Sequence, residues 1–228
     1  MFKGKNYSVT SIGDYAFESC SSLTSVIIPE SVTSIGDYAF EGCSSLTSAI
    51  ISEGVKTIGS WAFRDCSSLT SITIPESVTN IGAGVFQRCS ILASLVVKEG
   101  NTTYDSRDNC NAIIETNSNM LIYGCSSTVI PPSVTSIRGW AFSGCSSLTA
   151  ITIPEGVTSI GMYAFYGCSS LTSATIPESV KSIEDYAFCD CSNLTTVVAH
   201  KSWKKTFRKE RYNLFAGCSS LEKITYFK

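Results

Sequence analysis

The sequence predicts an α/β solenoid, in which short coils of chain stack along one axis. Three observations support this prediction: a 23-residue period, an alternation of apolar and polar residues within each period, and a regular placement of proline and glycine between the apolar stretches. Because no single coil can bury its apolar side alone, the coils must stack to form a continuous core. Eight Phe-x-x-Cys-x-x-Leu triplets mark the period, with their cysteines at Cys20, Cys43, Cys66, Cys89, Cys145, Cys168, Cys191 and Cys218.

The unit at residues 66–82 shows how one coil is built. Leu69, Ile72 and Ile74 form the Leu-x-x-Leu-x-Leu pattern of a leucine-rich repeat. The last two alternate with polar residues, which predicts a short strand with one buried side. Pro75 ends this strand, because it lacks the N–H that a continuing ladder needs.

The rest of the unit predicts the other sides of the solenoid. Val78 and Ile81 begin a second inward-facing stretch, and Gly82 allows a tight corner. Ala62 and Phe63, with their equivalents, predict a short helical or 3₁₀ segment in which Phe fills the space between coils. Nine candidate strands predict a parallel sheet on the concave side of a right-handed coil, with centres at Ile27, Ile50, Thr73, Val96, Val129, Thr152, Thr175, Val198 and Thr225.

The period is interrupted once, between Cys89 and Cys145. Residues 112–115 and 120–123 are apolar and flank a turn-like stretch at 116–119, which predicts a β-hairpin inserted at about 100–125. The repeat resumes in phase afterwards and no linker composition is present. We therefore expect residues 1–228 to form a single solenoid domain.

Composition limits the classes of partner. The formal net charge is −2 and only 16% of the residues are charged, so we expect no nucleic-acid partner. No run of apolar residues is long enough to cross a membrane, so we expect no membrane insertion. Residues 1–6 contain no apolar core of a signal peptide, so none is expected in this chain.

The cysteines and the single histidine are the strongest candidates for a catalytic or metal site, but each has a structural interpretation. The eight repeat cysteines are expected to be buried free thiols, each acting as a small apolar side chain. Cys110 and Cys125 bracket the hairpin, and whether they pair is left open. A single histidine, His200, excludes most hydrolase sites that use a histidine base and leaves no zinc site. We expect no catalytic residue, no metal site and no cofactor.

The outward positions of the predicted sheet are the first candidate binding surface. Most of them are Ser or Thr, which is typical of a solvated face, but Ile27, Ile50 and Val96 would expose apolar side chains in one region. Exposed apolar groups on such a surface favour a protein contact. The predicted binding residues of the sheet are Ser25, Ile27, Ser48, Ile50, Ser71, Thr73 and Val96.

The basic segment at residues 200–211 is the second candidate. Trp203 and Phe207 are four residues apart and can share one helix face. Two interpretations stay open: the aromatic residues pack onto the last coils while the cations are solvated, or Trp203 belongs to a docking patch for an acidic partner or a glycan.

The repeat resembles the BspA-like leucine-rich repeats of bacterial surface proteins. The consensus Cys-Ser-Ser-Leu-Thr-Ser-x-x-Ile-Pro-Glu-x-Val-x-x-Ile-Gly with Ala-Phe, as at residues 145–165, carries the resemblance, and the insertion at 101–115 is similar to one in members from gut Bacteroidetes. This resemblance implies an extracellular or cell-surface location and adhesion to a protein or glycoprotein, with host matrix proteins as candidates. We therefore expect a non-catalytic binding module. The alternative is an intracellular or structural interaction scaffold with no extracellular ligand.

Overall fold

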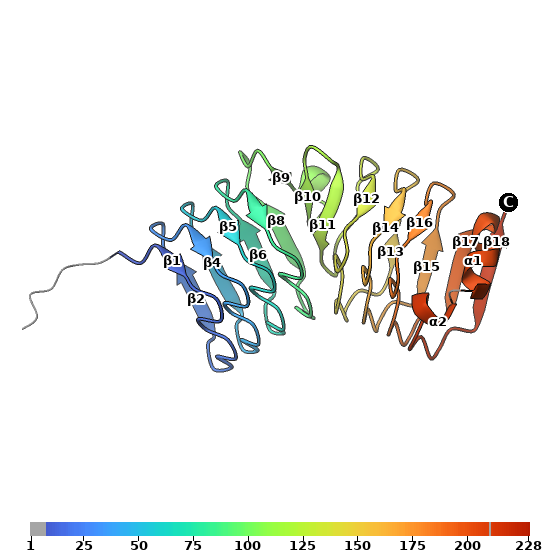
Figure 1. The fold of residues 1–228 in the computed structure, drawn as a ribbon, viewed down its shortest axis with the longest axis horizontal. Helices are drawn as coiled ribbons and strands as arrows, with labels where there is room; N and C mark the ends of the chain where they lie inside the picture. The colour runs from blue at the N-terminus through green and yellow to red at the C-terminus, as the bar shows by residue number, and fades with distance from the viewer. Residues whose placement is uncertain (1–7, 210) are drawn as a thin grey trace, which may run out of the picture.

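Each repeat unit forms one coil, and the coils lie side by side in chain order (Figure 1). The computed structural model describes residues 8–209 and 211–228. Within a central coil, a four-residue strand is followed by a proline turn, a two-residue strand and a longer series of turns. We call this series, residues 59–69 in one coil, the Phe–Cys turn. The solenoid predicted from the repeat is confirmed.

The strands that follow the Leu of each triplet form two parallel sheets on one broad side of the solenoid. The predicted strand at Val129 is absent, and this residue lies in an irregular segment instead. The continuous sheet expected from the repeat is therefore divided in two. The first sheet contains β2 (Ser25–Ile28), β4 (Ser48–Ile51), β6 (Ser71–Ile74) and β8 (Ser94–Val97). The second contains β13 (Ile151–Thr152), β15 (Ser173–Ile176), β17 (Thr196–His200) and β18 (Lys223–Phe227).

The remaining strands form two further sheets. One is parallel and contains β1 (Ser11–Ile12), β3 (Ser34–Ile35), β5 (Thr57–Ile58) and β7 (Asn80–Ile81). The other joins the insertion to the later coils, in the order β16 (Ser182–Ile183), β14 (Ser159–Ile160), β12 (Ser136–Ile137), β11 (Met120–Gly124), β10 (Ala112–Glu115) and β9 (Tyr104–Asp105).

The helical or 3₁₀ segments predicted around Ala62 and Phe63 are absent, and the chain forms turns there instead. Trp61 has a φ of 55° and Asp65 a φ of 56°, and these left-handed residues interrupt any helix. Alternate N–H groups also bond to the next coil: the N–H of Trp61 donates to the carbonyl of Ala83 at 2.8 Å. The described helices are short and lie elsewhere: η1 (Arg107–Asn109), η2 (Lys201–Trp203), α1 (Lys204–Lys209) and α2 (Arg211–Leu214).

Aromatic rings and thiols stack through the core. Phe63 is fully buried, with its ring centroid 5.2 Å from that of Phe40 and 6.0 Å from that of Phe86. All eleven cysteines are free, including the two that bracket the hairpin. Six of the eight repeat cysteines are buried as expected, whereas Cys20 is exposed and Cys218 is half-buried. Cys20 belongs to the first described coil, and no described coil packs on its outer side.

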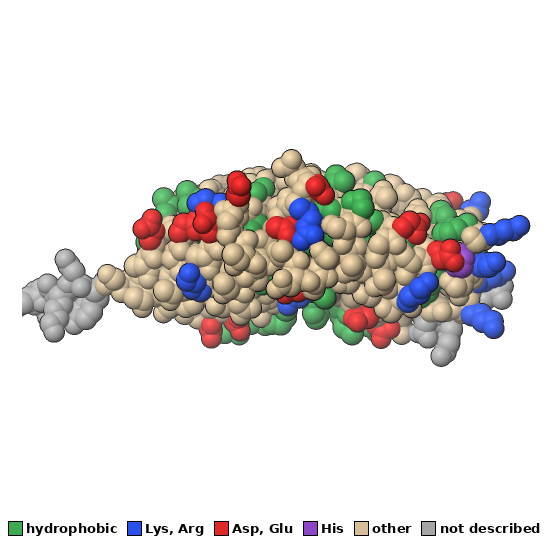
Figure 2. Space-filling model, turned by 90° about the horizontal axis from the view of Figure 1, so that it is seen from above, with side chains coloured by type: hydrophobic (Ala, Val, Ile, Leu, Met, Phe, Trp, Pro, Cys, Tyr) green, Lys and Arg blue, Asp and Glu red, His purple; other side chains and the backbone are tan. Residues whose placement is uncertain are grey.

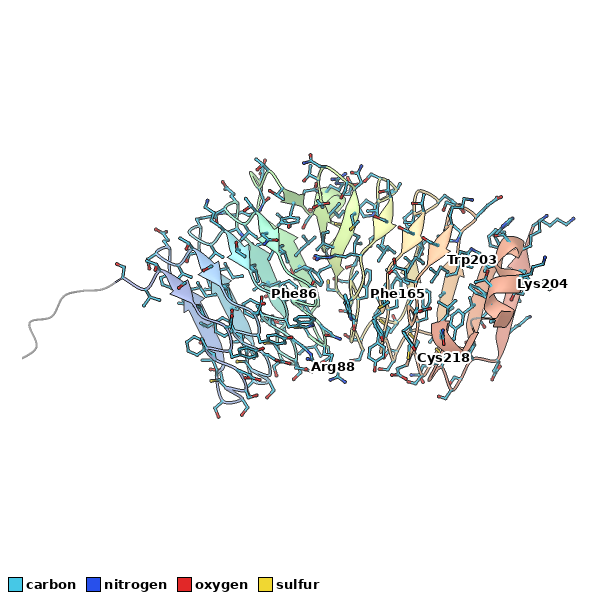
Figure 3. The ribbon with its side chains drawn as sticks, viewed as in Figure 1. Phe86, Arg88, Phe165, Trp203, Lys204 and Cys218 are labelled. Atoms are coloured by element: carbon cyan, nitrogen blue, oxygen red, sulfur yellow. The ribbon has the colours of Figure 1, made fainter. Side chains whose placement is uncertain are left out.

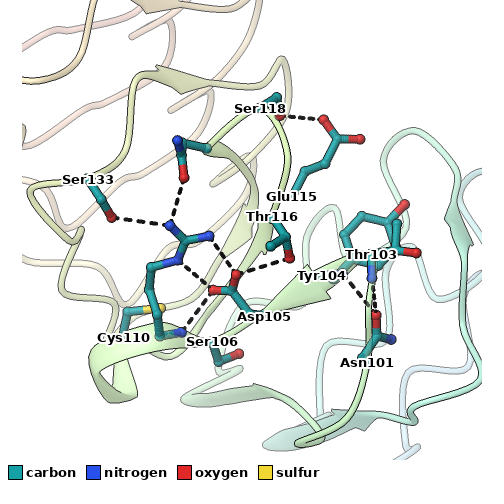
Figure 4. A network of polar contacts seen from close by, with 12 residues as sticks. Asn101, Thr103, Tyr104, Asp105, Ser106, Cys110, Glu115, Thr116, Ser118 and Ser133 are labelled. Atoms are coloured by element: carbon teal, nitrogen blue, oxygen red, sulfur yellow. Dashed lines mark hydrogen bonds and ion pairs between the residues drawn. The ribbon is translucent and has the colours of Figure 1, made fainter.

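The inserted hairpin is confirmed, since β10 pairs antiparallel with β11. Its side chains alternate between the two halves of the core: Ile113 packs with the N-terminal cluster of buried residues and Ile114 with the C-terminal cluster. Both faces of the hairpin are therefore buried, which explains its continuous apolar runs. Arg107 ties β9 to the turn of the hairpin: the guanidinium donates to both carboxylate oxygens of Asp105, at 2.8 and 2.6 Å, and to Asn119 at 2.7 Å (Figure 4).

The row of coils is arched, with the Phe–Cys turns along its inner edge and the sheets on its broad sides (Figure 1). The insertion accounts for the bend. Its strands add layers in the outer half of the arch. At the inner edge, the N–H of Arg88 bonds directly to the carbonyl of Ser143 at 2.9 Å, so that no inserted residue separates these two turns. The hollow side of the arch is thus lined by turns, where the sequence predicts the sheet.

Candidate functional site

The sheet face formed by β2, β4, β6 and β8 carries the predicted exposed apolar residues. Strand alternation buries Ile28 and Ile51 and turns Ile27 and Ile50 to solvent, where they are 70% and 53% exposed. The parallel register places Ile27 directly beside Ile50. Val96 is 38% exposed two strands further along. The polar residues predicted with them, Ser25, Ser48, Ser71 and Thr73, occupy the same face.

The sheet face is hollowed between β4 and β6. These strands pair at Ser48 and Ser71, whereas β2 and β4 pair along four positions. An open hollow of about 320 Å³ lies here, lined by both serines and by the outward side chains of Ile50 and Thr73. Predicted binding residues from two coils therefore meet at one concavity.

An ion pair borders this hollow. The ammonium of Lys98 lies 2.5 Å from the carboxylate of Glu53. The hydrogen bond from Lys98 lowers the pKa of Glu53, and the same bond raises the pKa of Lys98. Both groups are exposed, so the pair contributes little to stability. It supplies one charge of each sign beside an otherwise uncharged lining.

Trp203 is buried, which contradicts its prediction as a binding residue. It is 6% exposed, and its ring centroid is 5.4 Å from that of Phe207, which is itself buried. Figure 3 shows Trp203 directed among the side chains of the last coils and Lys204 at the C-terminal end. Lys and Arg side chains gather at that end when the proline turns are viewed from above (Figure 2). For residues 200–207, whose side chains the structure describes, the aromatic residues pack and Lys201, Lys204 and Lys205 are exposed, which favours the interpretation in which the cations are solvated.

The chain matches the BspA type leucine-rich repeat region in six copies, over residues 5–113 and 112–228. It belongs to the BspA-type leucine-rich-repeat family. The family resemblance predicted from the repeat consensus is therefore confirmed. No curated protein matches the chain in sequence.

Solved structures of leucine-rich-repeat proteins resemble this BspA-type chain. A protein from Eubacterium ventriosum is 28% identical over 97% of the chain, with a TM-score of 0.70. A Treponema pallidum protein, TpLRR, is 28% identical over 92% of this chain and 80% of its own, with a TM-score of 0.52. The pneumococcal vaccine antigen PcpA is 22% identical over 95% of the chain, with a TM-score of 0.70, and shares the fold. The chain spans 64% of the Eubacterium protein and 59% of PcpA.

The sequence predicts neither a membrane-spanning segment nor a metal site in this BspA-type chain. Within residues 8–209 and 211–228, no helix is long and apolar enough to cross a membrane. Among the same residues, no cluster of histidine, cysteine and carboxylate side chains has the geometry of a metal site. Residues 1–6, in which we expect no signal peptide, lie outside the described residues.

Sequence reasoning missed a second row of exposed aromatic residues. A Tyr or Trp stands two residues before the core Phe in six coils, and these side chains lie half-buried or exposed in the Phe–Cys turns. The Tyr-Ala-Phe and Trp-Ala-Phe triplets were the available signal, because a core position would not need an aromatic residue at both ends of the triplet. The row comprises Tyr15, Tyr38, Trp61, Trp140, Tyr163 and Tyr186.

Proposed function

We propose that this chain is a binding module displayed outside the cell, and that it adheres to a protein or glycoprotein through the sheet face. The observation that carries the proposal is the exposed pair Ile27 and Ile50, on adjacent strands beside the hollow between β4 and β6. Membership of the BspA-type family supports a role in recognition. The balance of charge and the coat of Ser and Thr side chains support an extracellular setting.

The energetics favour a protein partner over solvent at this surface. Full burial of an isoleucine side chain contributes about 1.5–3 kcal/mol. Ile27 is 70% exposed and Ile50 is 53% exposed, so a partner could still bury most of the first and half of the second. In the C-terminal sheet the equivalent positions are Thr152 and Thr175, so strand formation alone does not require isoleucine there. The serines and the Lys98–Glu53 pair around the isoleucines provide a polar rim, which is the usual anatomy of a recognition surface.

A double substitution tests this surface. Ile27→Thr with Ile50→Thr keeps the β-branched shape, so the melting temperature should stay close to that of the parent. Binding to immobilised fibronectin, laminin and collagen, and to the chain itself, is measured by surface plasmon resonance. We expect the ligand that binds the parent to bind the double variant about tenfold more weakly or worse.

Val129→Thr is the matched control. Val129 is 73% exposed but lies outside the strands of the sheet face, so its replacement should leave affinity unchanged. Equal affinity of the parent and the double variant would refute the site. Failure of an epitope-tagged chain to be reached by antibody on intact cells would contradict the surface location and favour the intracellular scaffold.

A further inference from the structure

The aromatic row of the Phe–Cys turns is held in a backbone conformation that does not favour bulky side chains. The six Tyr and Trp residues have φ values between 55° and 61°. Bulky side chains seldom adopt this left-handed region, and they are strained in it. Gly84 occupies the equivalent position in another coil with a φ of 62°, so the coil itself does not require an aromatic residue there. The repeated choice of Tyr and Trp therefore calls for a reason beyond the backbone.

The rings form two stacks, one on each side of the bend. Tyr38 lies 4.8 Å from Tyr15 and 5.0 Å from Trp61, measured between ring centroids. In the second stack, Tyr163 lies 5.8 Å from Trp140 and 5.1 Å from Tyr186. Stacking compensates part of the strain, and it leaves two aromatic ridges on the Phe–Cys turns.

The second stack borders a hollow. The hollow has a volume of about 550 Å³ and reaches from Gln87 and Arg88, across the bend, to Asp190. Trp140 and Tyr163 line one side of it. Figure 3 shows Arg88 at the inner edge, where the two halves of the arch meet. The insertion adds no turn at the inner edge, so the turn that contains Arg88 packs directly on the turn that contains Gly144. This contact brings the lining residues of the two halves together.

A second hollow of about 390 Å³ adjoins the first and shares Arg88, Tyr166 and Asp190 with it. The carboxylate of Asp190 accepts a hydrogen bond from the Tyr166 hydroxyl, which raises the pKa of Tyr166. Four repeat serines line the rest of this second hollow. Together the two hollows contain two arginines and two aspartates, so that their formal charges cancel. The combined surface is long, uncharged overall and rich in both hydrogen-bond donors and acceptors.

We propose that this inner-edge hollow binds a linear, neutral oligosaccharide that runs along the axis of the arch. A sugar ring presents hydroxyl groups that both donate and accept hydrogen bonds, and arginine, aspartate, glutamine and tyrosine side chains match them. Its C–H faces pack against aromatic side chains such as Trp140 and Tyr163. A volume in this range is that of an ordinary small-ligand site.

The same geometry disfavours an extended peptide. A peptide that adds to a protein by strand pairing needs free backbone N–H and C=O groups. Here the N–H groups of Arg88, Gly144 and Asp190 already donate to carbonyls of the next coil, at 2.9, 2.7 and 2.7 Å. Side chains therefore supply the polar groups that face the hollow, as a polyhydroxyl ligand requires. The site lies on another surface than the sheet face and does not rest on the proposed function.

The experiment titrates the whole chain with cellohexaose, mannohexaose, xylohexaose and maltohexaose by calorimetry, and follows tryptophan fluorescence in parallel. We expect at least one of these saccharides to bind and to change the emission of Trp140. Tyr163→Ala should weaken that binding about tenfold or more. Tyr38→Ala is the matched control: it has the same coil position and φ, it stacks on both sides, and it does not line the hollow.

Arg88→Gln and Asp190→Asn keep the test valid if Tyr163→Ala destabilises the chain. The Arg88 side chain is 52% exposed and Asp190 is also exposed, so neither change opens the core. Each should weaken saccharide binding while the melting temperature stays constant. Three results would overturn the proposal: none of the four saccharides binds, Tyr38→Ala weakens binding as much as Tyr163→Ala, or a proline-rich peptide displaces the bound saccharide and loses affinity on Tyr163→Ala as the saccharide does.

Discussion

The thiol of Cys66 donates a hydrogen bond to the carbonyl oxygen of Phe40 in the preceding coil, with Sγ and O 3.2 Å apart. The same carbonyl accepts the backbone N–H of Cys43 at 3.2 Å, so one oxygen closes its own turn and also ties it to the next coil. Five other coils repeat the thiol bond, from Cys43, Cys89, Cys168, Cys191 and Cys218. The repeat cysteine is therefore a coil-to-coil donor as well as a small apolar side chain.

Comparison of Cys66→Ser with Cys66→Ala tests this bond. Both variants lose the volume of sulfur, but serine keeps a donor for the Phe40 carbonyl. We expect the serine variant to be more stable than the alanine variant by about 0.5–1.5 kcal/mol, the net contribution of one hydrogen bond. Urea denaturation followed by circular dichroism measures the difference. An alanine variant as stable as the serine variant would show that the thiol acts through packing alone.

Phe63→Ala should lower the free energy of unfolding by about 3–5 kcal/mol, because it opens a cavity in the stacked core. The ring of Phe63 is fully buried between Phe40 and Phe86. Phe17→Ala is the control at the same coil position, where the ring is 39% exposed, and its loss should be clearly smaller. Equal losses in the two denaturation curves would contradict the ring stack as the main source of stability.

Tyr123→Phe should destabilise the chain by about 1–3 kcal/mol through the loss of one hydroxyl group. The Tyr123 hydroxyl accepts the N–H of Val85 at 3.0 Å and donates to the carbonyl of Gly82 at 2.9 Å. In the regular coils these two positions bond to each other within the turn, as from the N–H of Ala62 to the carbonyl of Gly59 at 3.4 Å, and here the hydroxyl bridges them. Burial raises the pKa of Tyr123 to about 12. Tyr15→Phe at an exposed site provides the control, and equal melting temperatures for Tyr123→Phe and the parent would refute this role.

Asp105→Asn should lower the melting temperature at neutral pH, and the difference from the parent should shrink in acid. Burial raises the pKa of Asp105, but the hydrogen bonds and charge of Arg107 outweigh burial and hold the pKa below its usual 3.8. A depressed pKa stabilises the fold above the usual value, and this stabilisation is lost as the pH falls through the native pKa. Melting curves at neutral pH and below the usual pKa measure the change. A difference that does not vary with pH would contradict the ion pair.

Thiol labelling should separate the cysteines by burial. Cys20 is exposed and should react first with a maleimide, followed by the half-buried Cys218. Cys43 should react slowly, because it is buried and because burial raises the pKa of its thiol to about 11, which lowers the thiolate fraction at neutral pH. Mass spectrometry of digests counts the modified sites. Rapid labelling of Cys43 in the native chain would be inconsistent with the stacked coils.

The sequence by itself determined the features that depend on short-range pattern and on the period. Alternation within residues 72–74 predicted which side chains face solvent, and the 23-residue period predicted that like residues stack. The hairpin followed from two apolar runs around a turn. The exposure of Ile27 and Ile50 followed from the same alternation. These features are local, or are repeated at one spacing, so a single chain contains all the information that they need.

The tertiary structure decided everything that depends on which coils meet across the insertion. No spacing in the sequence indicates that Arg88 bonds to Ser143, or that the Tyr123 hydroxyl closes a gap at Val85. The Phe–Cys turns are not helical because their N–H groups find partners in the next coil. Trp203 is buried because the last coils offer it a surface. The contacts of Arg88, Tyr123 and Trp203 join residues that the period does not relate, and the bonds between successive turns form only once the coils are stacked.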